Sequence, residues 1–310
     1  MIRPVTVAVC ITTYRRPSML RRLLHALQSL TFTDVAEPDI AIVVVDNDPF
    51  GSARAVVAEF LSRRYRLRYR VEIRPGVSFT RNTAIESART ADFIAFLDDD
   101  EQPSPPWLDA LLTAQSAFHA PIVAGPVLPR FESTPPQWMI DGHFFHRKRF
   151  ATGTTVPCTG AGNVLISSRV LHALSPIWFE PRYTLCGGED THFFRRCAEL
   201  GFRITWADDA VVYESVPRAR LSPNYLVNRA RNGGNHWTRV DLELHPSLGH
   251  LGARFAAGIF RVLQGSALAV VAPALSPAHQ LRGKLLMAEG TGNLHAFLGR
   301  SFNAYGGPVQ

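Results

Sequence analysis

Residues 93–108 read FIAFLDDDEQPSPPWL, and this stretch decides the expected fold. Its first five residues are apolar on both faces, which is typical of a strand buried inside a sheet that helices cover. Three carboxylates follow at the carboxyl end, and prolines then end the loop before a helix expected over 107–117. A buried strand that ends in acidic residues predicts an α/β protein with a site at the edge of its sheet.

The ninety residues before this stretch alternate strand and helix signals in the same way. Apolar runs predict strands at 5–11 and 40–45, a further strand is expected at 68–73, and helices are expected at 20–30, 53–64 and 79–88. Polar clusters follow three of the strands, namely Thr12-Thr13-Tyr14, Asp46-Asn47-Asp48 and Asp98-Asp99-Asp100. Because ligands of such sheets bind at the carboxyl ends of strands, the three clusters predict one pocket.

The next hundred residues predict further strands around an irregular segment. Strands are expected at 121–127, 160–167, 202–206 and 210–213, and Gly187-Gly188-Glu189-Asp190 opens a helix that ends at Leu200. Residues 129–157 hold four prolines and show little periodicity. A segment of this length in a compact enzyme is a functional lid or a disordered loop.

Composition limits the class of protein. The chain has 310 residues, 46% hydrophobic and 19% charged, which excludes a disordered chain or a small disulfide-stapled domain. Its 33 basic and 26 acidic residues give a net charge of +7, which predicts attraction to phosphates, acidic lipid headgroups or nucleic acid. The four cysteines lack metal-ligand spacing and the first eleven residues lack a signal-peptide pattern, so we expect a cytosolic protein.

Two acidic groups are candidates for chemistry. The carboxylates of Asp98, Asp99 and Asp100 are hard oxygen ligands that suit Mg²⁺ or Mn²⁺ beside substrate phosphates, although the same triplet also fits a solvated turn. Glu189 and Asp190 begin a helix, where carboxylates serve as caps. If the pocket binds a nucleotide-linked donor, Asp190 is also the candidate general base for an acceptor hydroxyl.

A basic segment and several lone residues allow two interpretations. Four arginines flank Tyr225 and fit either a solvated basic face or fixed cations for a diphosphate leaving group: Arg218, Arg220, Arg229 and Arg231. Tyr14 fits either stacking on a base or packing. His143 and His146 are interpreted as surface histidines rather than metal ligands.

Five segments in order carry a resemblance to a known family. They are VCITTYRRP (9–17), VVVDND (43–48), RPGVSFTRN (74–82), FIAFLDDDEQPSPPWL (93–108) and GGEDTHFFRR (187–196). Over about residues 5–235 the chain resembles the inverting glycosyltransferases of family 2, which have the GT-A fold. The continuation VVYESVPRARLSPNYLVNRARNGG (211–234) is similar to the branch that builds bacterial exopolysaccharides, including succinoglycan-type glucosyltransferases.

The resemblance implies a role for each candidate residue. Thr12, Thr13 and Tyr14 would contact the nucleotide, Asp46 the uracil edge, Asp98 the ribose, and Arg81 and Asp99 would lie in the same donor pocket. Asp100 would hold a divalent Mn²⁺ or Mg²⁺ on the diphosphate of a UDP-sugar. Asp190 would be the base, with Glu189 beside it at the acceptor side, and Arg229 and Arg231 would lie near the departing diphosphate.

The resemblance also implies a domain organisation and a reaction. Residues 1–240 would form the GT-A domain, with a nucleotide-binding half (1–128) and an acceptor-side half (129–240), and 241–310 a helical appendage. Arg15 stands where many members have Asn, and the Gln-x-x-Arg-Trp signature of processive synthases is missing. We therefore expect transfer of one sugar per encounter, with inversion at the anomeric carbon.

The appendage bears on location and acceptor. Five apolar side chains can line one helix face away from Arg254 and Arg261: Leu251, Phe255, Ile259, Val262 and Leu263. That face fits either a membrane surface or core packing. The uncharged stretch 262–281 is interpreted as a surface or re-entrant segment. On the membrane interpretation, the acceptor is a polyprenyl-linked oligosaccharide at the inner face of the plasma membrane.

Other classes explain the residues less well. A nucleotidyltransferase or another Rossmann-like nucleotide-sugar enzyme is disfavoured because the first turn, residues 12–17, contains no glycine. A basic nucleic-acid-binding protein accounts for the net charge but leaves the acidic triplet unexplained, and nucleic acid is not expected as a partner. An inactive relative is disfavoured because every expected carboxylate is present.

Overall fold

The computed structural model describes residues 3–271 and 276–302, and the chain forms two compact units. The first unit comprises the chain up to residue 130 together with 147–184 and 189–215. The second comprises 131–146, 185–188 and the chain from 216 onward. The predicted boundary at residue 240 falls inside one helix of the second unit, and the functional division that it expresses stays a prediction.

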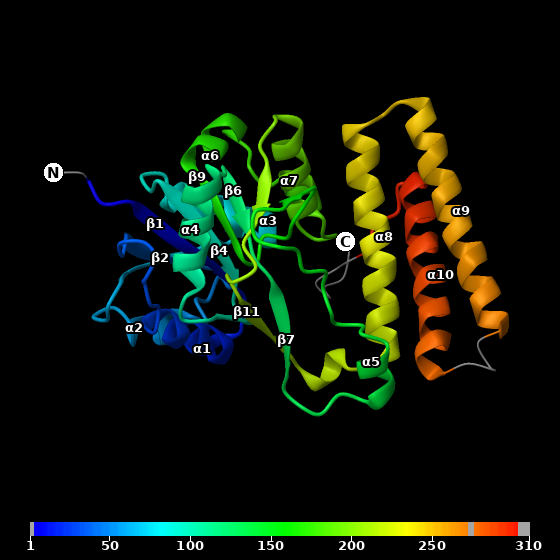
Figure 1. Cartoon of the computed structure of the whole chain (residues 1–310), viewed down its shortest axis with the longest axis horizontal. Helices are drawn as coiled ribbons and strands as arrows, with labels where there is room; N and C mark the ends of the chain where they lie inside the picture. Colours follow the sequence, from blue (N-terminus) through cyan, green and yellow to red (C-terminus); the bar gives the residue numbers. More distant parts are fainter. Residues whose placement is uncertain (1–2, 272–275, 303–310) are drawn as a thin grey trace. The chain divides into compact units, whose positions relative to one another are not determined.

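An eight-stranded sheet forms the centre of the first unit (Figure 1). Four strands lie side by side and parallel, which matches the expected mostly parallel α/β sheet. The spatial order is β3 (Arg66–Val71), β2 (Asp39–Asp46), β1 (Thr6–Thr13), β4 (Phe93–Asp98), β9 (Val164–Ser167), β6 (Ile122–Ala124), β10 (Ile204–Trp206) and β8 (Thr155–Val156). β9 runs antiparallel between β4 and β6.

Helices cover both faces of this sheet, so the sheet separates two apolar cores. One core gathers the leucines of α1 (Pro17–Gln28) and the apolar face of α4 (Trp107–Phe118). The other gathers residues of α3 (Val77–Ser87), α6 (Ser168–Leu174) and α7 (Glu189–Glu199). Strands that are apolar on both faces require this double cover, as the sequence predicts.

Short elements complete the two units. The helix α2 (Arg54–Ala58) and the 3₁₀ turn η1 (Pro181–Tyr183) belong to the first unit, and the 3₁₀ turn η2 (Arg218–Arg220) belongs to the second. A three-stranded sheet consists of β5 (Glu101–Pro103), β11 (Val212–Val216) and β7 (Val127–Phe131), and its residues belong to the first unit except for the last residues of β7 and β11. β5 follows the acidic triplet directly and pairs with β11. The residue that follows the triplet, Glu101, is therefore fixed in a second sheet.

Two predicted elements differ from the observed ones. The helix predicted over 53–64 ends at Ala58, because the following turns tie back to α1 through Arg64, whose guanidinium donates to the Leu30 carbonyl at 2.6 Å. The strand predicted over 121–127 divides into β6 and β7, which belong to different sheets. The chain bends at Gly125, where a Cβ would lie 2.4 Å from the Ala210 carbonyl oxygen.

The second unit is helical. It contains α5 (Gln137–Asp141), α8 (Pro223–Leu244), α9 (Leu248–Val271) and α10 (Pro277–Phe297), so the predicted C-terminal helical segment is confirmed. α10 packs between α8 and α9 (Figure 1). The stretch 262–281 is not one segment, since its described residues divide between the end of α9 and the start of α10. Among the described residues, α9 is the one helix long and apolar enough to cross a membrane.

Candidate active site

Strand register brings the three predicted polar clusters to one edge of the sheet. Thr13 at the end of β1 is paired with Asp46 of β2, and Thr12 is paired with Asp98 of β4. The three strands are parallel and end level with one another, so their polar residues emerge on the same side. The predicted convergence of the clusters is therefore present in the structure.

Asp99 and Asp100 are buried carboxylates that share one cation. The Thr13 hydroxyl donates to Asp99 Oδ2 at 2.9 Å, and Arg16 Nη1 lies 2.9 Å from Asp99 Oδ1 and 3.4 Å from Asp100 Oδ2. Burial raises the pKa of the Asp99 carboxyl, while Arg16 and Thr13 oppose the rise. At the end of β4, these carboxylate oxygens therefore lie against a positive charge, the Arg16 guanidinium.

Asp46 is fully buried and shapes the loop after β2. Its two oxygens accept from the backbone N–H groups of Asp48 at 2.9 Å and Ala53 at 2.8 Å, and from the Tyr69 hydroxyl at 2.9 Å. The carboxylate therefore fixes the turn that leads into α2. Its predicted contact with a uracil edge stays a prediction.

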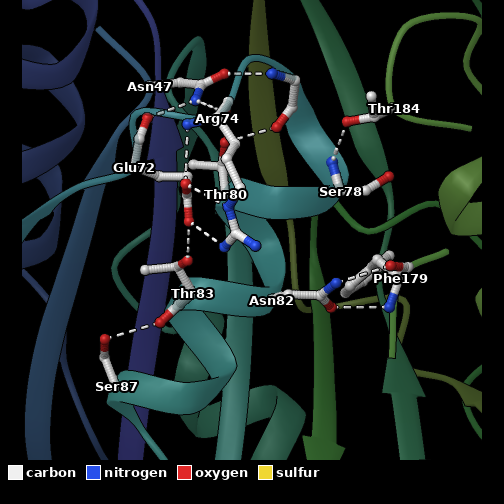
Figure 2. Close-up of polar contacts among 11 residues, drawn as sticks. Asn47, Glu72, Arg74, Ser78, Thr80, Asn82, Thr83, Ser87, Phe179 and Thr184 are labelled. Carbon is white, nitrogen blue, oxygen red and sulfur yellow. Dashed lines mark hydrogen bonds and ion pairs between the residues drawn. The ribbon is translucent and has the colours of Figure 1, made fainter. Parts of the chain in front are cut away.

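Asn47 and Glu72 organise the entry to α3, as Figure 2 shows. The Asn47 amide donates to the carbonyls of Glu72 and Arg74, each at 2.8 Å, and accepts from the Gly76 N–H at 2.7 Å. Hydrogen bonds from Arg74, and one from the Thr83 hydroxyl, lower the pKa of Glu72 to about 2. Sequence reasoning missed this cluster, although Asn47 and Arg74 stand inside two of the quoted segments.

The same helix is fastened to the segment that precedes α7. Ser78 N–H donates to the Thr184 hydroxyl at 3.2 Å, and Asn82 exchanges two hydrogen bonds with the Phe179 backbone, at 2.8 and 2.9 Å (Figure 2). Gly76 has a φ of +116°, and a Cβ there would lie 2.2 Å from the Thr184 hydroxyl oxygen. Only glycine fits this position, and α3 thus positions the chain leading to Glu189.

Arg81 joins the carboxylate at the end of β4 to a carboxylate at the start of α7. Its side chain is 6% exposed, and Nη1 lies 2.6 Å from Glu189 Oε1 while Nη2 lies 3.2 Å from Asp98 Oδ1. Phe179 packs beneath the guanidinium, 5.4 Å from the ring centroid to Cζ. One buried cation therefore connects the end of β4 to the first turn of α7. Sequence reasoning placed Arg81 in the donor pocket and did not foresee its link to Glu189.

Glu189 and Asp190 differ in burial and in charge. Glu189 is 3% exposed, and burial raises its pKa to about 7, with the Asp190 carboxylate adding to the rise and Arg81 opposing it. Asp190 is half-buried, and its Oδ2 lies 3.4 Å from the position that a Cβ of Gly160 would take. Asp190 is thus the more exposed member of the pair, and its predicted role as the base stays a prediction.

Glu101 is hydrogen-bonded to the backbone of the acidic triplet. Its carboxylate is buried and accepts from the Asp98 N–H at 2.9 Å, and burial raises its pKa well above the ordinary value. A Cβ on Gly162 would lie 2.4 Å from Glu101 Oε1, so the Gly-rich turn before β9 makes room for this carboxyl. The sequence signal is that Glu101 is the fourth residue of the acidic run that begins at Asp98. The interpretation of the first three as a triplet did not use it.

The remaining predicted residues divide between the two units. Tyr14 is 51% exposed beside the pocket, with the Arg15 guanidinium 5.1 Å from its ring centroid. Arg229 and Arg231 belong to the second unit, where they lie near the rings of Phe145 and Phe302. The first unit thus brings together all the predicted site residues except these two arginines.

The carboxylate oxygens at the end of β4 are suitable ligands for a divalent cation. Asp99 and Asp100 are nearly buried carboxylates against the Arg16 guanidinium, and Asp98 is half-exposed above them. Mg²⁺ and Mn²⁺ are commonly held by one or two carboxylates together with substrate phosphates. Over residues 3–271 and 276–302 no three His, Cys, Asp or Glu side chains converge as a complete protein cage. The residues present fit a cation that phosphate oxygens also coordinate.

A mixed sheet with acidic strand ends and a Glu-Asp pair at a helix start is the architecture of GT-A glycosyltransferases. The fold agrees with crystal structures of S. aureus TarS 1–349, solved with UDP and with UDP-GlcNAc. Each has a TM-score of 0.52 and 17% sequence identity, over 96% of this chain and 92–93% of the other.

Residues 8–174, more than half of the chain, match the model of glycosyl transferase family 2, and the chain belongs to this family. Over 242 residues it is 33% identical to the succinoglycan biosynthesis protein ExoM of Rhizobium meliloti (strain 1021), covering 75% of this chain and 74% of ExoM. It is 24% identical to the glycosyltransferase AglE of Haloferax volcanii over 66% of this chain and 65% of AglE. The protein is a glycosyltransferase related to succinoglycan biosynthesis.

Proposed function

We propose that this glycosyltransferase moves a hexose from a UDP-sugar to a hydroxyl of a glycan acceptor, with inversion at the anomeric carbon. The observation that carries the proposal is the buried Arg81, which joins Asp98 at the strand end to Glu189 beside Asp190. The carboxylates proposed for the donor side and for the acceptor side are thereby linked within a single unit. The UDP and UDP-GlcNAc complexes of TarS support a UDP-linked donor.

Asp190 is the general base of the proposed reaction. Its half-buried carboxylate takes the proton of the acceptor hydroxyl while that oxygen bonds to the anomeric carbon from the face opposite the leaving group. The bond from the anomeric carbon to the β-phosphate oxygen breaks, and its electron pair leaves with UDP. Glu189 stays on Arg81 and keeps the first turn of α7 in place. A single displacement of this kind inverts the configuration.

The strand-end carboxylates serve the donor. Asp100, with Asp98 and Asp99 beside it, would hold Mn²⁺ or Mg²⁺, which supplies charge stabilisation to the diphosphate leaving group. Thr12, Thr13 and Tyr14 line the nucleotide side. Arg229 and Arg231 are proposed as further cations for the diphosphate. The enzyme's work is positioning and charge stabilisation rather than covalent catalysis.

We propose a lipid-linked oligosaccharide of exopolysaccharide assembly as the acceptor, at the cytoplasmic face of the plasma membrane. The similarity to a succinoglycan biosynthesis protein supports the pathway class. The net charge of +7 supports approach to an anionic leaflet.

Calorimetric titration with UDP tests the donor site directly. UDP is added to the protein with Mn²⁺, then with EDTA, and the titration is repeated with Asp100→Ala and with Asp209→Asn, an exposed carboxylate outside the site, as the matched control. We expect metal-dependent binding that Asp100→Ala removes and Asp209→Asn retains. A panel of UDP-sugars then identifies the sugar that binds most tightly. UDP binding that EDTA leaves unchanged, or no UDP binding with Mn²⁺ or with Mg²⁺ in its place, would contradict the proposal.

A further inference from the structure

Both charged side chains of helix α9 form ion pairs with acidic residues of the neighbouring helices. It carries two charged side chains, Arg254 and Arg261, over 24 residues. Arg254 pairs with Asp241 of α8, and Arg261 Nη1 lies 2.9 Å from Glu289 Oε2 of α10. Both cations are thus neutralised by acids of the neighbouring helices within the second unit. Both side chains stay partly exposed, 32% for Arg254 and 41% for Arg261, on the sides of α9 that border α8 and α10.

The outward side of α9 is a continuous apolar ridge. Its large side chains are exposed to between 41% and 80% of their surface: Phe255, Ile259, Phe260, Leu263, Val270 and Val271. At 1.5 Å per residue the helix is about 36 Å long. Single exposed apolar residues are ordinary on a protein surface, but six of them on one helix between Phe255 and Val271, a span of about 24 Å, mark an interaction surface.

Small residues explain why this ridge stays outside. α9 contacts α10 through Gly258 and Gly265, its two buried residues. A Cβ on Gly265 would lie 2.6 Å from the Gly283 carbonyl oxygen, and one on Gly290 would lie 2.7 Å from the Gly258 carbonyl oxygen. Close backbone packing holds the two helices together, and of the large exposed side chains of α9 Phe255 also packs edge-to-face on Phe297 of α10, with 5.3 Å between ring centroids.

The charges near this ridge favour a lipid bilayer, rather than a second copy of the chain, as its binding partner. Gly283 packs against Ala269, and on either side of it Lys284 is an exposed cation, while Arg282, also exposed, donates from Nη2 to the Gly142 carbonyl at 3.3 Å. Basic side chains beside an apolar ridge match an anionic leaflet, where lipid tails take the ridge and headgroups take the cations. A second copy would instead bring another chain of net charge +7 to the same face.

The inward ion pairs also decide how the helix lies. If α9 crossed the bilayer, α10 would have to follow it and carry the Arg261–Glu289 pair into the hydrocarbon core. Lying in the plane of the interface, α9 keeps this pair on the water side. We propose that α9 is an in-plane membrane-docking helix, whose outward ridge enters the acyl boundary of an anionic leaflet. The proposal deepens the proposed membrane location and stands without the transfer reaction.

Co-sedimentation with vesicles tests the proposal on the full chain, without sugar donor or acceptor. Vesicles of phosphatidylcholine with and without phosphatidylglycerol are compared for the wild type, for Phe260→Asp/Leu263→Asp, and for Leu61→Asp/Leu200→Asp. The second pair is the matched control, since these leucines are 58% and 55% exposed in the first unit. We expect binding to anionic vesicles that the α9 pair weakens by about tenfold or more and the control pair leaves unchanged.

Three further results would overturn the proposal. They are equal binding by the α9 pair and the control pair, resistance of the bound protein to alkaline carbonate, which would indicate a spanning helix, and a dimer in sedimentation that the α9 pair dissociates. A Phe260→Trp variant gives a second measurement, because its fluorescence shifts to the blue on vesicles if the ridge enters lipid. Urea unfolding of each variant establishes that the fold is intact, and transfer activity, assayed separately, does not enter the result.

Discussion

The edge of the central sheet and helix α9 use charge in opposite ways. At the sheet edge, charged side chains converge on a pocket and pair across long stretches of chain, as Arg81 does with Glu189. On α9 the charges turn inward, and the apolar side chains face outward. Oppositely charged side chains that are buried together fix the geometry of a site. A helix face that lacks charged side chains is instead suited to an apolar environment. The difference supports the two proposals, which give the chemistry to the first unit and membrane docking to the second.

The largest effect is expected at the base. Asp190→Asn should lower the rate of transfer by about 10²–10⁴-fold while UDP binding is retained, because the amide cannot take the acceptor proton. Single-turnover transfer and UDP titration on the same preparation measure the two quantities, with Asp209→Asn as the control. Full activity in Asp190→Asn would move the base elsewhere and break the assignment of chemistry to this edge.

The buried cation comes next. Arg81→Met should destabilise the protein by about 3–5 kcal/mol, because it leaves the carboxylate of Glu189 buried without its partner. Arg89→Met, which breaks an exposed pair with Glu86, should cost about 1 kcal/mol or less. Urea unfolding measures both. The double variant Arg81→Met/Glu189→Gln should recover part of the loss, and strictly additive effects would show that the two side chains are not coupled.

Adjacent glycines of α8 sharpen the contrast in the second unit. A Cβ on Gly234 would lie 2.3 Å from the Glu289 carbonyl oxygen, whereas a Cβ on Gly233 meets nothing within 4 Å. We expect Gly234→Ala to destabilise by about 1–3 kcal/mol and Gly233→Ala to stabilise by about 0.5–1 kcal/mol. Thermal unfolding measures the sign of each change. The same sign for both would argue against close packing of α8 on α10.

The smallest expected effect depends on pH. The pKa of Glu72 is lowered from 4.5 to about 2 in the folded protein, so its stabilisation is present above about pH 4.5 and is lost as pH falls toward 2. Glu72→Gln should therefore cost about 1–3 kcal/mol at pH 7 and progressively less below pH 4.5. Denaturant unfolding at several pH values measures this. A cost independent of pH would mean that packing, not charge, is lost.

Local patterns predicted the donor half well. Apolar runs located β1, β2, β3 and β4 within a few residues, and the polar residues after them meet because parallel strands end level. The family resemblance predicted the fold and the enzyme class. These features depend on neighbouring residues or on short segments, which a sequence displays directly.

Long-range contacts could not be predicted in the same way. The division into β6 and β7 depends on Gly125 meeting Ala210, and the short α2 depends on Arg64 reaching the end of α1. The Arg81–Glu189 pair joins residues 108 positions apart. Helix periodicity suggested an apolar face in the C-terminal segment, but the inward direction of Arg261 required its partner Glu289 on another helix.

The separation between Arg81 and Glu189 also has a consequence for synthesis. A ribosome adds about 5–20 residues each second, so the strands and helix that surround Arg81 emerge about 5–20 s before Glu189 is made. During that interval the guanidinium has no Glu189 to neutralise it in a closed core. Until then Asp98 of β4 is the ion-pair partner that Arg81 has, and the pair with Glu189 forms only after α7 has been synthesised.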